Sequence, residues 1–182
     1  MFEEEHENRR DRITNLPVYK KAEEICVLVN RMLTNSDPDE LAKTEFMEDV
    51  ESEMIERMFE QNKEFMLANA IMIPAKIAGA EGDDIYDLRM ENAAVIRKAA
   101  RELITDARGL QMNGFKDIEY LDLLRSAVEE FRVLFAEWVA TFDNENYIID
   151  RWGLFNPPGV NYDDHDPDDD LPFDPDGFFD DL

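Results

Sequence analysis

Four stretches of the chain repeat apolar residues at steps of three and four, and no stretch alternates apolar and polar residues for long. Steps of three and four place side chains on one face of an α-helix, whereas a strand needs a period of two. The sequence therefore predicts an all-α fold. The first stretch carries its apolar stripe at Val18, Ala22, Ile25, Val29 and Met32.

Proline, glycine and asparagine residues separate these stretches into helices with short connections. Short connections favour antiparallel neighbours, so we expect an up-down-up-down antiparallel four-helix bundle over residues 15–150. Pro74 should kink the second helix or end its regular part near Ile73, because its ring removes a backbone donor. The expected helices cover about residues 16–34, 40–78, 84–112 and 118–142.

The other three helices carry apolar stripes that we assign to the core. In the second helix, methionine and phenylalanine residues stand opposite many glutamates, and part of this stripe would lie at a subunit interface if the chain self-associates. The stripe of the second helix is Phe46, Val50, Met54, Met58, Phe65 and Met66. That of the third is Ile85, Leu88, Ala93, Ile96, Ala100, Leu103, Ala107 and Leu110, and that of the fourth is Leu121, Leu124, Val128, Phe131, Leu134, Phe135, Trp138 and Val139.

Polar segments flank the bundle on both sides. Residues 1–14 are charged and predict a flexible N-terminal arm. Residues 151–182 hold ten aspartates and one arginine, a net charge of −9, and are interrupted by prolines. Such a segment buries too little apolar area to offset its chain entropy, so we expect a disordered acidic C-terminal tail.

The formal net charge of −25 limits the partners that this chain can bind. It repels nucleic-acid phosphates, which argues against direct nucleic-acid binding and favours a basic protein partner. The chain has one cysteine, Cys26, no signal-peptide pattern at its start and no apolar run long enough for a membrane span. We therefore expect a cytoplasmic protein with no membrane association.

Histidine is too scarce for the usual catalytic and metal sites of a helical bundle. The two histidines, His6 and His165, fall in the arm and the tail, so a di-iron centre, a zinc site or a histidine-based triad cannot form inside the bundle. The acids of segment 164–168 resemble a calcium loop, but the glycine and glutamate that this loop requires are absent. We expect no enzyme activity, no cofactor and no bound metal.

Two patches in the tail combine aspartates with large apolar side chains. Acids beside aromatics in a flexible chain can enter a hydrophobic pocket with a basic rim, and the first patch resembles the acidic tip of bacterial single-stranded-DNA-binding proteins. The alternative is a tail that only adds solubility. The predicted partner-binding residues are Asp168, Asp169, Asp170, Leu171, Phe173, Phe178, Phe179 and Leu182.

Four short motifs occur in order along the expected helices. They are Leu16-Pro17-Val18-Tyr19-Lys20-Lys21, Ile73-Pro74-Ala75-Lys76-Ile77-Ala78-Gly79-Ala80-Glu81-Gly82, Ala99-Ala100-Arg101-Glu102-Leu103 and Phe135-Ala136-Glu137-Trp138. Over residues 15–143 the chain resembles a four-helix-bundle family. That family includes proteins encoded in ribosomal RNA intervening sequences and the accessory variability determinant of diversity-generating retroelements.

The resemblance implies a homo-oligomer, typically a pentamer, and for the retroelement branch a non-catalytic partner of a reverse transcriptase and its RNA. Two departures stand out: Lys76 replaces the asparagine usual in the family, and the chain is acidic where the retroelement proteins are basic. We therefore expect an oligomeric accessory or scaffold protein whose tail recruits a basic protein, such as a reverse transcriptase or another nucleic-acid enzyme. The alternative is an acidic decoy that mimics nucleic acid and inhibits a DNA- or RNA-binding protein.

Overall fold

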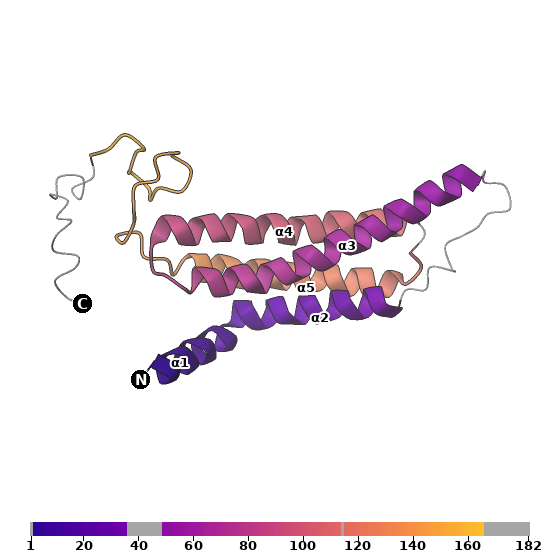
Figure 1. Cartoon of the computed structure of the whole chain (residues 1–182), viewed down its shortest axis with the longest axis horizontal. Helices are drawn as coiled ribbons and strands as arrows, with labels where there is room; N and C mark the ends of the chain where they lie inside the picture. Colours follow the sequence, from indigo (N-terminus) through magenta and orange to yellow (C-terminus); the bar gives the residue numbers. More distant parts are fainter. Residues whose placement is uncertain (1, 36–48, 114, 166–182) are drawn as a thin grey trace.

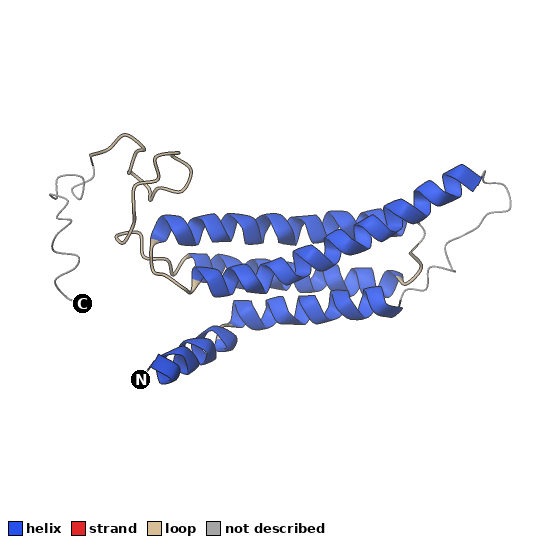
Figure 2. Ribbon diagram, viewed as in Figure 1, coloured by secondary structure: helices blue, strands red, loops and turns tan. Residues whose placement is uncertain are grey.

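The computed structural model describes residues 2–35, 49–113 and 115–165 of the chain. Within these ranges the protein is all-α, with five helices and no strand (Figure 2). The predicted fold class is confirmed at that level. The helices are α1 (Phe2–Asn15), α2 (Pro17–Asn35), α3 (Asp49–Ala80), α4 (Tyr86–Met112) and α5 (Ile118–Val139).

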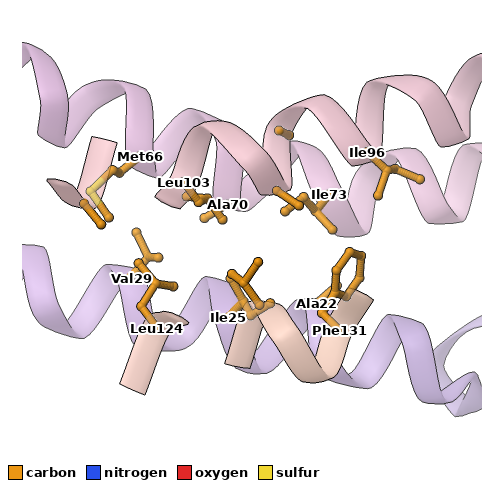
Figure 3. Close-up of a cluster of buried hydrophobic side chains, with 14 of the residues drawn as sticks. Ala22, Ile25, Val29, Met66, Ala70, Ile73, Ile96, Leu103, Leu124 and Phe131 are labelled. Carbon is orange, nitrogen blue, oxygen red and sulfur yellow. The ribbon is translucent and has the colours of Figure 1, made fainter. Parts of the chain in front are cut away.

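Helices α2 to α5 lie alongside one another and share one apolar core (Figure 1). The predicted stripe of α2 is entirely buried, and on α4 and α5 most of the predicted residues are buried as well. Figure 3 shows the middle of this core, where isoleucine, leucine and methionine side chains of all four helices meet. The labelled residues are Ala22, Ile25, Val29, Met66, Ala70, Ile73, Ile96, Leu103, Leu124 and Phe131.

Helix α3 buries a different face from the predicted one. Met54, Met58 and Phe65 were assigned to the core, but they are 61%, 48% and 50% exposed. Met66 is buried as expected, whereas Phe46 and the side chain of Val50 lie outside the described residues. The face that α3 turns to the core carries Phe59, Met66, Ala70, Ile73 and Ile77.

Pro74 lies inside α3, and the helix continues beyond it to Ala80. Proline removes one backbone hydrogen bond from a helix. Ile73, Ile77 and Ala80 are fully or almost fully buried on either side of it. Their burial offsets that loss, since each large apolar side chain that leaves water contributes about 1.5–3 kcal/mol.

The two polar flanks are more ordered than the sequence predicts. Residues 2–15 form α1 instead of a flexible arm. The chain after α5 forms turns up to His165, and the carboxylate of Asp150 accepts backbone N–H hydrogen bonds from Trp152, Leu154 and Phe155 at 2.8, 2.8 and 2.9 Å. Residues 166–182, the rest of the predicted disordered tail, lie outside the described residues.

The segment after α5 also sets where α4 begins. The backbone N–H of Tyr86 donates to the carbonyl of Asn146 at 2.8 Å, while Ile85 has an extended backbone. A second contact joins the N–H of Ile148 to the carboxylate of Asp87 at 2.9 Å. These contacts hold residues 146–148 against the start of α4, which lies two residues later than the sequence predicts.

Within the described ranges, no helix combines the length and the apolar character that crossing a membrane requires.

Candidate functional site

The tail residues predicted to bind a partner all fall beyond His165. Asp168, Asp169, Asp170, Leu171, Phe173, Phe178, Phe179 and Leu182 lie outside the described residues. Their role therefore stays a prediction, and the surfaces of the helical body supply the structural evidence.

In the part of the chain that the structure describes, no three His, Cys, Asp or Glu side chains are grouped so that they could hold a metal ion. Cys26 is half-buried on α2, and burial raises the pKa of its thiol, with a smaller contribution from the nearby Glu23. A raised pKa leaves less of the reactive thiolate at neutral pH. Cys26 accordingly packs against the core as a small side chain.

A buried ion pair lies at the end of the bundle where α3 and α5 end and α4 begins. The guanidinium of Arg89, on α4, donates to the carboxylate of Glu81 at 2.6 Å, and both side chains are about nine-tenths buried. The indole N–H of Trp138, on α5, donates to the same carboxylate oxygen at 2.8 Å. The guanidinium also lies over the ring of Phe142 at 4.1 Å. These contacts join three helices at one point.

Helix α1 attaches to the same point through its arginines. Arg9 and Arg12 donate to the backbone carbonyl of Glu81 at 3.4 and 3.3 Å, and Arg12 also lies 3.8 Å from its carboxylate. Arg9 and Arg12 belong to the charged segment that the sequence predicts to be a flexible arm, and here they contact the end of the bundle. Their partner, Glu81, is 69 residues from Arg12 along the chain, so no local pattern could reveal it.

A groove with an apolar floor and a basic rim runs between α4 and α5, with a volume of about 710 Å³. Ile104, Val128, Phe131 and Phe135 contribute to its floor. We call this surface the α4/α5 groove. Arginines from both helices line it: Arg97, Arg101 and Arg108 from α4, and Arg132 from α5.

The arginines of α4 are unusual for so acidic a chain, in which 44 acidic residues face 19 basic ones. Arg132 pairs with Glu129 at 2.9 Å. Among the described residues, however, the side chains of Arg97, Arg101 and Arg108 form no ion pair or hydrogen bond. Three free guanidinium groups beside an apolar floor suit a ligand with both acidic and apolar groups.

A second surface is the exposed apolar stripe of α3. Met54, Met58, Phe65 and Met72 are 61%, 48%, 50% and 41% exposed. Gln61, Ala68 and Ala75 are exposed too and continue the same spacing of four and three residues. This is the spacing of the contact seam in a coiled coil. We call these seven residues the α3 stripe.

Comparison with protein-family models, with curated proteins and with solved structures finds no match to this chain. The resemblance to the retroelement accessory family is therefore neither supported nor contradicted, and it stays a prediction.

Proposed function

We propose that this protein is a non-catalytic, self-associating accessory protein that recruits a basic protein partner. Its body would be an up-down-up-down antiparallel bundle of α2 to α5, and its acidic C-terminal segment would contact the partner. The observation that carries the proposal is the α3 stripe, because a helix that is already packed in a core still exposes a regular seam in which Gln61 is the one polar residue.

Burial of this seam would stabilise an assembly. Exposed apolar patches of this kind commonly mark protein interfaces, and a four-three spacing lets side chains of one helix enter the gaps of another. Each methionine or phenylalanine that leaves water contributes about 1.5–3 kcal/mol. We assign a second copy of this chain as the partner that covers the seam, since the family resemblance implies a homo-oligomer. A pentameric ring is the typical form.

The charge of the chain supports a basic protein as the partner. With a net charge of −25, the chain attracts cationic surfaces and speeds their encounter. A reverse transcriptase or another nucleic-acid enzyme fits, because such proteins carry basic surfaces that bind phosphates. The acidic protein would then act beside nucleic acid without binding it.

Sedimentation and light scattering of the full chain across micromolar concentrations test self-association. We expect an oligomer that the double substitution Phe65→Glu and Met72→Glu converts to monomers, because it places charges in the apolar seam. The matched control is Leu123→Glu with Val133→Glu, which adds the same charge at exposed apolar positions of α5. A wild-type monomer, or an assembly that the α3 substitutions leave intact, would refute the proposal for α3.

Capture experiments test the partner. Full-length protein should retain a basic partner that a chain ending at His165 loses, and the interaction should weaken as salt rises. Equal retention by both chains would show that the tail is not the recruiting segment.

A further inference from the structure

The α4/α5 groove suits a ligand that carries both carboxylates and large apolar groups. Its apolar floor gains from burying aromatic or branched side chains, and its three unpaired arginines gain from carboxylates. A nucleic-acid backbone would satisfy the arginines but would leave the floor without an apolar partner, and the charge of −25 would oppose its approach. An acidic peptide with aromatic residues satisfies both parts of the groove.

The chain carries such a peptide at its own C-terminus. Residues 166–182 contain eight aspartates, three phenylalanines and two leucines, with no basic residue. We infer that this C-terminal segment binds the α4/α5 groove of its own chain, with aspartates at the arginine rim and phenylalanines on the apolar floor. The inference goes beyond the proposed function, which assigns the segment to a foreign partner.

The path of the chain brings the segment to the correct end of the groove. The groove begins near Val139, the last residue of α5, and Asn146 and Ile148 are hydrogen-bonded to the start of α4. Figure 1 shows the later residues of the described chain beyond that same end of the helices. Arg151 then donates to the carbonyl of Asp164 at 2.7 Å, which fixes the point from which the segment departs.

The length of the segment is sufficient. Seventeen residues follow His165 and can span up to about 56 Å when extended. Along α4, the groove arginines start about 15 Å from Asp87 and end about 32 Å from it, at a rise of about 1.5 Å per residue. Attachment to the same chain also gives the segment an effective concentration on the order of millimolar, so weak contacts suffice to hold it.

Binding within the chain would make recruitment competitive. A basic partner must attract the acidic segment more strongly than the α4/α5 groove does, and its arrival would expose the groove. Only a partner that binds the acidic segment more tightly than the groove does would therefore be recruited.

A spin label on the C-terminal segment of the full-length protein tests the inference. We would replace Cys26 by Ala, introduce Pro175→Cys as the labelling site, and record backbone amide signals of the labelled chain diluted in excess unlabelled, unmodified chain. Dilution restricts the observed broadening to contacts within one chain. The expected result is selective loss of signal at Arg97, Arg101 and Arg132, with α2 unaffected.

Two sets of substitutions define the contact. Charge reversal by Arg97→Glu and Arg101→Glu should abolish the broadening, whereas Arg10→Glu with Arg31→Glu changes the net charge equally at exposed sites outside the groove and should preserve it.

Replacement of Phe173, Phe178 and Phe179 by Ser leaves the helical body unchanged and should also abolish the broadening. No broadening in the unsubstituted groove, or broadening that persists in both the groove and phenylalanine variants, would overturn the inference. Broadening seen only when labelled and isotope-enriched chains are mixed would also overturn it, by showing that a second copy supplies the segment. Each of these outcomes is independent of whether the α3 stripe forms an oligomer.

Discussion

Glu81→Gln should destabilise the protein through the ion pair at the end of the bundle. The substitution keeps the size of the side chain but removes its charge, leaving the buried guanidinium of Arg89 without its close counter-ion. Removing one charge of a buried ion pair lowers the free energy of unfolding by about 3–5 kcal/mol. Asp84 lies 3.7 Å from the same guanidinium and the ring of Phe142 lies against it, so the lower end, about 3 kcal/mol, applies.

Urea unfolding followed by circular dichroism measures this loss at one fixed protein concentration. With a slope of about 2 kcal/mol per molar urea, a loss of about 3 kcal/mol lowers the midpoint by about 1.5 M. In an Arg89→Met background the buried carboxylate of Glu81 has lost its close counter-ion, so the same change should cost less than about 1 kcal/mol or stabilise the protein.

The control is Glu102→Gln, which breaks the exposed pair between Lys98 and Glu102. That pair has a distance of 2.7 Å, yet exposed pairs of this kind contribute less than about 1 kcal/mol. The reasoning fails if Glu81→Gln costs no more than Glu102→Gln, or if its cost is the same with and without the arginine at position 89.

Two further predictions concern the contact between α3 and α4 and the segment after α5. A Cβ at Gly109 would lie 2.7 Å from the side-chain nitrogen of Asn62, so Gly109→Ala should be nearly neutral alone. In an Asn62→Ala background, where nothing is displaced, it should show the full helix gain of about 1 kcal/mol in urea unfolding, and an equal effect in both backgrounds would contradict the predicted contact. The N–H of Trp152, then those of Phe155 and Leu154, lower the pKa of Asp150 below its ordinary 3.8. The carboxylate therefore stabilises its turn above pH 3.8 and loses that effect as the pH falls through the lowered pKa, so Asp150→Asn should speed amide exchange of those residues at neutral pH but make little difference in strong acid.

The sequence predicted α2, α4 and α5 well because each has a single apolar stripe. A helix with one apolar face has only one favourable orientation toward a core, so periodicity alone identifies the buried residues. Val18, Ile25, Ile96 and Phe131 were assigned to the core on this basis and are all buried. The proline, glycine and asparagine residues between the helices predicted the helix ends to within a few residues, as at Tyr86.

Helix α3 shows where this reasoning ends. It carries two apolar stripes with the same four-three spacing, one through Phe59 and Met66 and one through Met58 and Phe65. Periodicity reports which residues share a face but not which of two apolar faces meets the neighbouring helices. Methionine and phenylalanine made the second stripe look like the core. The positions of α2 and α4 decide that the first stripe is buried.

The sequence by itself determined the helical class of the protein, the core faces of three helices and the acidic character that limits its partners, because these depend on local spacing and on composition. Only the tertiary structure decided the pairing of Arg89 with Glu81, the burial of one face of α3 and the gathering of free arginines in the α4/α5 groove. The ion pair spans the turn between α3 and α4, and the groove and the buried face of α3 depend on residues of several helices. Their contacts depend on how the helices pack, which no local pattern encodes.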